Sequence, residues 1–339
     1  MAIKEFELEN FGPLKKVHGQ SLGSLNLIIG ANSTGKTFLL KALYMMLRSQ
    51  EETGRGDDPR DFDEVLSEKC YWTFQVDKLG DLVRRGAGNR LKARMVQDDN
   101  CALVIDFGQD TTKRITPVHN NLGPREANSV FLPPKEVLSL AKVIIKSGLH
   151  DKAFGFDATY TDLVLALQKP TQMGRNYDAF KQSRISLEKM FQGRIEFDAG
   201  NDSWVYRKGN SRFSIHSTAE GIKKIAILDT LLGNRYLSPD SIIFIDEPES
   251  ALHPKAISQF LDILAVLAEK GIQVFMASHS YFVVKKLHLL ALQNNISIPV
   301  LMGDSDDGWQ QADLKDGIPE NGIIDESIRL FELELEASA

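Results

Sequence analysis

The stretch "GANSTGKT", Gly30 to Thr37, has the residue types and spacing that a polypeptide needs to hold a polyphosphate. It matches the pattern G-x-x-x-x-G-K-[ST], with a short apolar strand expected before it and a helix after it. Glycines at both ends allow the backbone to curl, so that successive N–H groups point inward at phosphate oxygens. The sequence therefore predicts a site for a nucleoside triphosphate.

Side chains of this loop have separate predicted roles. Lys36 is expected to reach the β- and γ-phosphates, and the Thr37 hydroxyl is a candidate ligand for Mg²⁺. The helix that follows adds the partial positive charge of its N-terminus. The loop residues that we expect to contact ATP are Gly30, Asn32, Ser33, Thr34, Gly35, Lys36 and Thr37.

Two adjacent carboxylates, Asp246 and Glu247, follow the apolar run Ile242 to Ile245. Ligands of parallel α/β sheets bind at the carboxyl ends of the strands, where buried carboxylates are costly unless they meet a cation. We expect Asp246 to hold Mg²⁺ and Glu247 to orient and deprotonate the attacking water. The alternative is a surface turn that happens to be acidic.

A histidine, His279, ends the next apolar strand in "IQVFMASHS". A histidine after a strand is often only a hydrogen-bonded structural residue. Here one helix separates the two strands, and a right-handed crossover would place them side by side. His279 is then expected near the γ-phosphate, and the predicted catalytic residues are Lys36, Glu247 and His279.

These residues are positioned by an alternation of strands and helices in the last third of the chain, which is typical of a parallel α/β sheet. We expect helices at 221–232, 254–270 and 281–293. In the first two thirds we expect a polar loop at 50–67, a hairpin at 194–216, and further strands and helices. The strands are 72–76, 102–107, 114–118 and 129–132, and the helices are 135–147, 160–167 and 177–191.

Composition narrows the class of protein. The chain has 339 residues, of which 42% are hydrophobic and 25% charged, with a net charge of -6, so a nucleic-acid surface would have to be a local patch. Its cysteines, Cys70 and Cys101, have no metal-type spacing, and no disulfide framework is expected. No apolar run approaches the ~18 residues of a membrane span. We expect a cytoplasmic protein that does not enter the membrane.

Two charged segments each allow two interpretations. The first collects Lys78, Arg84, Arg85, Arg90, Lys92 and Arg94. It is either a contact for a phosphate backbone or a solvated surface whose charge is reduced by nearby aspartates. The second, "GDSDDG" at 303–308, could bind Mg²⁺ in a nuclease, but the chemistry of a tight turn explains its aspartates well.

The order "GANSTGKT", "STAEGIKK", "IIFIDEPESALHP" and "MASHS" resembles the ABC-type ATPase heads of the SMC/RecF group. Within that group the chain is similar to OLD-like and Septu-like antiphage ATPases of the AAA_15/AAA_21 kind, without a Toprim domain. The opening "IKEFELENFGPL" and the ending "NGIIDESIRLFELELE" support this narrower resemblance. It covers residues 1–50 and about 212–339 well, and the middle poorly.

The resemblance implies that Ser217 to Gly221 is the signature loop, which closes on the γ-phosphate bound by a second copy. Ser217 and Gly221 would then contact ATP across the interface, although Ala219 and Glu220 replace the usual pair of glycines and only Gly221 is retained. The alternative is a capping box, in which Ser217 and Glu220 only cap the helix that follows. Ser250 and Ala251 would lie at the dimer seam.

Two further assignments stay open. His253 is either a seam residue or the cap of the helix that begins at Pro254. The family's Q-loop glutamine could be Gln75, Gln97 or Gln109, or its region could be taken by "VFLPPKE".

The predicted fold is an ABC-type P-loop α/β head with a mostly parallel core sheet, an antiparallel N-terminal subdomain and a mainly helical insert. Residues 1–134 and 193–339 would form the head, and 135–192 the insert, a candidate docking element for a partner. The resemblance implies a slow ATPase that uses ATP and Mg²⁺ and forms a head-to-tail homodimer or a larger even-numbered assembly. It would control a separately encoded nuclease or toxin in phage defence. The alternative is a DNA repair or recombination ATPase that acts on nucleic acid itself.

Overall fold

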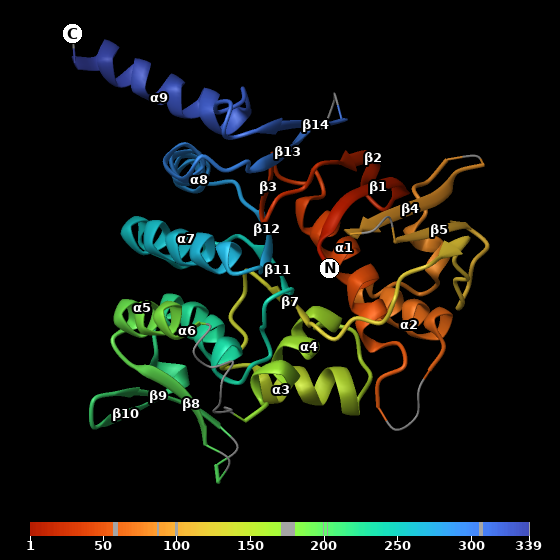
Figure 1. Cartoon of the computed structure of the whole chain (residues 1–339), viewed down its shortest axis with the longest axis horizontal. Coiled ribbons are helices and arrows are strands. Elements are labelled where there is room, and N and C mark those ends of the chain that lie inside the picture. Colours follow the sequence, from red (N-terminus) through yellow and green to blue (C-terminus); the bar gives the residue numbers. More distant parts are fainter. Residues whose placement is uncertain are drawn as a thin grey trace.

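The structure is a computed structural model that describes residues 1–56, 60–86, 88–98, 101–170, 180–198, 200–201, 203–304 and 308–338. Its centre is a six-stranded sheet in the order β14-β13-β3-β12-β11-β7 (Figure 1). All neighbouring pairs are parallel except β13 and β14. The strands are β3 (Leu25–Gly30), β7 (Ser129–Leu132), β11 (Ile242–Asp246), β12 (Gln273–Ala277), β13 (Pro299–Asp304) and β14 (Gly308–Asp313).

The central strands are mostly apolar because both faces of the sheet are covered. Side chains of β3 alternate between two cores: Leu27 and Ile29 pack with the helices of the last third, and Ile28 packs with the N-terminal part. The covering helices are α1 (Lys36–Glu52), α6 (Glu220–Gly233), α7 (Pro254–Glu269) and α8 (Tyr281–Asn294). The expected parallel α/β arrangement is confirmed.

A second sheet of five antiparallel strands, in the order β2-β1-β4-β5-β6, packs against α1 (Figure 1). Its strands are β1 (Ile3–Phe11), β2 (Leu14–Gly19), β4 (Arg90–Gln97), β5 (Ala102–Gly108) and β6 (His119–Asn120). This sheet is the antiparallel N-terminal subdomain that the sequence predicts. The strand expected at 114–118 is absent from the described residues, and only the short β6 follows that segment.

The segment between α1 and β4 differs from its prediction. A helix, α2 (Phe62–Phe74), occupies the end of the expected loop at 50–67 and the beginning of the strand expected at 72–76. It ends where Gln75 adopts a left-handed conformation with φ 51°. A short 3₁₀ turn, η1 (Leu79–Leu82), follows it. The aromatic residues near its end have strand propensity, but they continue a helix that packs on α1.

The middle of the chain contains short helices and a small sheet. The helix expected at 135–147 begins only at α3 (Ala141–Ile145), because the Glu136 carboxylate accepts a hydrogen bond from Ser139 N in a turn before it. A π-turn, η3 (Lys146–His150), then precedes α4 (Ala158–Leu167) and α5 (Lys181–Phe191). The beginning of the helix expected at 177–191 lies outside the described residues.

The expected hairpin is confirmed as a three-stranded sheet in the order β10-β9-β8. Its strands are β8 (Arg194–Asp198), β9 (Ser203–Lys208) and β10 (Ser211–Ser214), and the turn η5 (Ile215–Ser217) leads into α6. Helices α4 and α5 bury Leu163 and Leu187 in the same core as α6 and α7. The separate 135–192 unit therefore stays a prediction, since its helices share the core of the head.

The last element, α9 (Gly322–Ser338), extends away from the body of the molecule (Figure 1). None of its described side chains is fully buried. Residues 305–307 of "GDSDDG" lie outside the described residues, and so does the prediction for this stretch. No helix in the described ranges is long and apolar enough to cross a membrane.

Candidate nucleotide-binding and catalytic site

The phosphate loop joins the end of β3 to the start of α1, as predicted. Its backbone requires glycine at both ends: a Cβ on Gly30 would lie 2.3 Å from the Gly303 carbonyl oxygen, and one on Gly35 2.7 Å from Leu14 Cδ2. Gly35 also has a φ of 94°, which side chains disfavour. The loop is therefore shaped by close packing as well as by its turn.

The Lys36 ammonium lies over the phosphate loop. It donates hydrogen bonds to the carbonyl oxygens of Gly30 and Ala31, each at 2.8 Å. Burial lowers the pKa of Lys36, and the nearby carboxylates of Asp246 and Glu247 oppose that shift. A phosphate bound in the loop would act in the same direction as these carboxylates and favour the charged amine.

Thr37 and Asp246 meet although 209 positions separate them in the sequence. The Thr37 hydroxyl donates a hydrogen bond to Asp246 Oδ2 at 2.7 Å. Burial raises the pKa of Asp246, because its charged form has lost water, and the Thr37 hydrogen bond opposes this. A hydroxyl and a carboxylate oxygen are hard ligands of the kind Mg²⁺ takes, so this pair fits the predicted metal role.

Glu247 and His279 lie beside this pair because β11 and β12 are adjacent. The Glu247 backbone N donates to Ala277 O at 2.9 Å, which holds the residue at the strand end with a left-handed φ of 52°. Its Oε1 is 3.7 Å from His279 Nδ1, and both side chains are partly exposed, 39% and 49%. The carboxylate is thus accessible to solvent and next to an imidazole.

A hollow of about 480 Å³ brings these groups together. Its phosphate end is lined by Asn32, Ser33, Gly35, Lys36, Thr37, Asp246, Glu247 and His279. The structure therefore places together most of the residues that the sequence predicts for catalysis, metal and phosphate contact. Gly30 and Thr34 belong to the same loop but do not line this hollow.

The other end of the hollow is apolar and was not foreseen. It is lined by Pro13, Phe38, Thr73 and Phe74, and the Phe38 and Phe74 rings lie 4.5 Å apart between centroids. The sequence predicts a strand at 72–76, so it does not indicate that Thr73 and Phe74 of α2 line this hollow. No motif marks them, since any apolar helix end could supply such a wall.

Two further residues, which the sequence analysis did not indicate, make contacts at the ends of β11 and β12. Glu249 Oε1 accepts hydrogen bonds from Ser278 Oγ at 2.8 Å and from His279 N at 3.2 Å, which fixes the backbone of the histidine. Lys224 of α6 donates to the Glu247 carbonyl oxygen. Burial lowers the pKa of Lys224 to about 8, although the surrounding carboxylates act in the opposite direction.

The predicted signature loop lies outside this hollow. Ser217 is exposed at the end of η5, and Gly221 is the second residue of α6. The capping-box interpretation is wrong: the N-cap is Ala219, which has no side-chain hydrogen bond, and Glu220 instead pairs with Lys223 at 3.5 Å. Ser217 therefore has no capping role in α6.

The loop after β11 packs against the signature loop. A Cβ on Gly221 would lie 2.7 Å from the Ala251 carbonyl oxygen, and Ser250 Oγ donates to Pro134 O at 3.3 Å. The sequence left His253 as either a seam residue or a helix cap, and the structure shows the cap. Its Nδ1 accepts a hydrogen bond from Lys255 N at 3.2 Å at the start of α7.

None of the candidate Q-loop glutamines lines the hollow. Gln97 is buried and pairs with Gln50, Gln75 accepts a hydrogen bond from Gly155 N, and Gln109 donates to backbone oxygens at the surface. The segment after β7 instead follows a strand that runs parallel to β11. The position of a Q-loop stays a prediction.

Carboxylates partly neutralise the basic segment at 78–94. Arg94 pairs with Glu5 on the neighbouring strand, and Arg90 with Asp106. Arg84 donates to the Pro13 carbonyl oxygen at 2.7 Å. These contacts favour the solvated-surface interpretation over a dedicated phosphate-backbone contact.

The fold and the site together define a P-loop ATPase of the ABC/SMC-head type. The chain belongs to the AAA_21 family, described as an AAA domain, putative AbiEii toxin, Type IV TA system, whose profile matches residues 89–285. The profile of a second family, the AAA_15 AAA ATPase domain, matches residues 1–92. The predicted class is therefore confirmed.

Two curated proteins are similar to shorter parts of this chain. The chain is 30% identical to the Old nuclease of Escherichia phage P2 over 151 residues, which is 42% of this chain and 22% of that protein. It is 32% identical to the DNA replication and repair protein RecF of Clostridioides difficile (strain 630) over 71 residues, which is 21% of this chain and 19% of RecF. The matches thus span about a fifth of each relative's length.

Solved structures show the fold. The SMC head domain from Thermotoga maritima aligns with a TM-score of 0.50 at 13% identity, over 92% of this chain and 99% of that one. An SMC head bound to the C-winged helix domain of ScpA aligns with a TM-score of 0.54 at 10% identity, over 92% and 98%.

Proposed function

We propose that this chain is a slow ATPase switch that pairs head to tail with a second copy around ATP. The observation that carries the proposal is the single hollow in which Lys36, Thr37, Asp246, Glu247 and His279 converge. Phosphoryl transfer to water needs a phosphate-binding cation, metal ligands and a group that accepts a proton, and these side chains supply each of them.

The side chains have the following roles in this proposal. Lys36 binds the β- and γ-phosphates, and Thr37 with Asp246 holds Mg²⁺, which neutralises phosphate charge when bound. Glu247 orients the attacking water and accepts its proton, and its exposure leaves room for that water. His279, 3.7 Å from Glu247, contacts the γ-phosphate.

The apolar end of the hollow is proposed to hold the base. Pro13, Phe38 and Phe74 form a wall on which a flat ring can pack, since aromatic side chains favour offset or tilted contacts with other rings. The phosphate loop and this wall share one hollow, so a nucleotide would extend from β1 and α2 to the ends of β11 and β12.

Dimerisation is proposed because the γ-phosphate side of the hollow lacks the signature loop of its own chain. Ser217 is exposed, and neither it nor Gly221 lines the hollow that contains Lys36. A second copy related by a two-fold axis could supply both residues in each direction. The likeness to SMC heads supports this arrangement, and larger even-numbered assemblies would repeat it.

The proposal also includes a regulatory role in phage defence. The family description names a toxin–antitoxin system, and a phage P2 nuclease is among the relatives. We propose that ATP-driven pairing controls a separately encoded nuclease or toxin, with residues 135–192 as the candidate docking element. Co-purification with the product of a neighbouring gene, and its loss on Lys36→Ala, would test this step.

Glu247→Gln tests the proposed chemistry. The amide keeps the shape of the side chain but cannot accept the proton, so steady-state ATP turnover should fall by about 10² to 10⁴-fold. ATP binding, followed with a fluorescent analogue, should stay within a factor of a few.

The matched control for this variant is Glu269→Gln, which changes an exposed glutamate at the end of α7 and should leave turnover unchanged. Wild-type turnover in Glu247→Gln would contradict the proposed role of Glu247.

The match to RecF supports a second candidate, an ATPase that acts directly on DNA. In that case the exposed side chains of Arg84 and Arg85 would contact the phosphate backbone. Salt-sensitive DNA binding that is lost on Arg84→Glu with Arg85→Glu would favour this candidate over the switch.

A further inference from the structure

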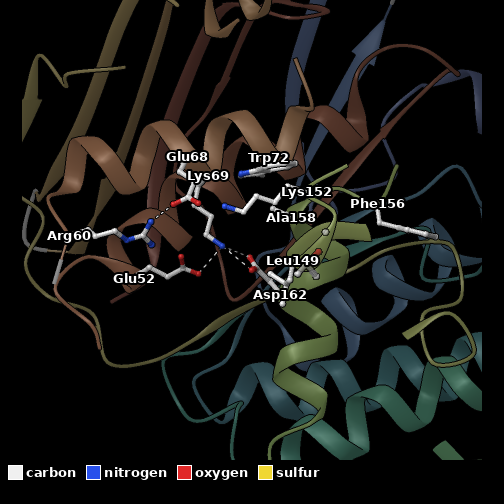
Figure 2. A pocket seen from close by; sticks show the side chains of 12 residues that line it. Glu52, Arg60, Glu68, Lys69, Trp72, Leu149, Lys152, Phe156, Ala158 and Asp162 are labelled. Atoms are coloured by element: carbon white, nitrogen blue, oxygen red, sulfur yellow. Dashed lines mark hydrogen bonds and ion pairs between the residues drawn. The ribbon is translucent and has the colours of Figure 1, made fainter. Parts of the chain in front are cut away.

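A cavity of about 160 Å³ lies between α2 and the segment that joins α3 to α4, away from the nucleotide hollow. Figure 2 shows it between α2, which carries Glu68, Lys69 and Trp72, and the start of α4, which carries Ala158 and Asp162. The two hollows share none of their lining residues. The proposed function assigns no role to this cavity.

The floor of the cavity is a preformed network of charges (Figure 2). The buried Lys69 ammonium is 2.8 Å from both Asp162 Oδ1 and Glu52 Oε1. Tyr44 donates to Asp162 Oδ2 at 2.8 Å, and Arg48 is 2.9 Å from Glu52 Oε1. These contacts hold the floor on α1, so the cavity does not have to be assembled by a ligand.

The lining of the cavity has three cations and three carboxylates, but they are not all paired. The carboxylates are Glu52, Glu68 and Asp162, and each already pairs with a cation, Glu52 and Asp162 with Lys69 and Glu68 with Arg60. Arg48 beneath the floor is paired as well, with Glu51, Glu52 and Asp162. Of the lining cations Arg60, Lys69 and Lys152, only Lys152 has no carboxylate partner among the described residues.

An anion that enters the cavity would therefore pair with Lys152. Among the described residues its exposed ammonium has no hydrogen-bond or ion-pair partner, and the indole N–H of Trp72 has no hydrogen-bond partner. The rest of the wall is apolar, from Leu149, Phe156 and the Trp72 ring. The cavity thus offers free donors beside flat apolar surfaces.

We propose that this cavity is a second binding site, for a small aromatic anion with one ring and one carboxylate. A cavity of about 150 Å³ is known to accommodate benzene, so one ring is the size that fits. The ring would pack between Trp72 and Phe156, and the carboxylate would accept hydrogen bonds from Lys152 and Trp72.

Benzoate is the probe, with neutral benzamide as its matched control, and binding is followed by ligand-observed NMR on the full chain. A carboxylate is used because a phosphate ester would also bind the phosphate loop. We expect saturable binding of benzoate and at least about tenfold weaker binding of benzamide, because a charge-assisted hydrogen bond is lost. Absence of saturable benzoate binding would overturn the proposal.

Variants locate the bound benzoate. Lys152→Ala should weaken binding about tenfold, and Leu149→Trp, which fills the cavity from its exposed rim, should abolish it. Lys189→Ala, at an exposed lysine of α5, should leave binding unchanged, and so should Lys36→Ala. Binding that survives Lys152→Ala and Leu149→Trp at full strength, or that is lost on Lys36→Ala, would place benzoate elsewhere and contradict the proposal.

Discussion

At the scale of residues, some side chains of the site can be recognised from their type and spacing in the sequence. Others can be recognised only from the contacts that they make in the folded chain. The position of Lys36, Asp246 and Glu247 in one site could be predicted because their types and spacing match a phosphate loop and a pair of carboxylates at a strand end, and their chemical roles stay predictions. Lys224 and Glu249 could not, because their roles depend on the Glu247 carbonyl oxygen and the His279 backbone N, which folding brings to them.

Lys224 gives a prediction at this scale. Burial sets its pKa at about 8, below the ordinary value of 10.5, so the unfolded chain binds more protons between these pH values. The contribution of Lys224 to the free energy of unfolding therefore rises with pH from about 8 to 10.5, by at most about 1.4 kcal/mol per pH unit. Lys224→Met removes this term.

Urea unfolding without nucleotide or Mg²⁺ measures it. The difference in the free energy of unfolding, wild type minus Lys224→Met, should increase across that pH window and level off as the pH falls below 8. Lys189→Met, at an exposed lysine, should give a difference that does not change with pH. If the difference for Lys224→Met also did not change with pH, the buried amine of Lys224 would not have the lowered pKa.

At the scale of elements, the alternation of strands and helices could be predicted from the sequence. Local departures from that alternation could not. Strands β3, β11 and β12 are short apolar runs followed by turn or polar residues, and that pattern is specific to buried parallel strands. The end of α2 was assigned to a strand because its aromatic residues favour strands in isolation. Its packing on α1 decides the outcome, and that contact is not visible in a local stretch of sequence.

The contact between α6 and the loop after β11 gives the prediction at this scale. An added Cβ on Gly221 would lie 2.7 Å from a backbone oxygen of Ala251, which cannot rotate away. Gly221→Ala should therefore lower the free energy of unfolding by about 1–3 kcal/mol, measured by urea unfolding.

Gly322→Ala is the matched control, because Gly322 also lies in the first turn of a helix but has no heavy atom within 4 Å of an added Cβ. It should be neutral or stabilising by up to about 1 kcal/mol. Equal effects of the two substitutions would mean that the close approach at Gly221 is relieved at no cost.

At the scale of the whole molecule, the site is open where a second copy would close it. Lys36, Glu247 and His279 share one hollow, whereas Ser217 and Gly221 lie on a different part of the surface of the same chain. The sequence could indicate this separation only through the resemblance to ABC-type heads, since no residue pattern states which chain a loop will serve. We therefore propose that each complete ATP site combines the phosphate loop of one copy with the predicted signature loop of another.

Mixing two impaired variants tests that claim most directly. Lys36→Ala loses the ammonium proposed to bind phosphate, and Ser217→Ala loses the hydroxyl proposed to contact the γ-phosphate without adding bulk that would block pairing, so each variant alone should hydrolyse much less ATP than the wild type. In an equimolar mixture, about half of the dimers are mixed and each has one intact site of two, so about a quarter of wild-type turnover should return. Turnover of the mixture no greater than the sum of its parts, or full activity of Ser217→Ala alone, would contradict the shared site.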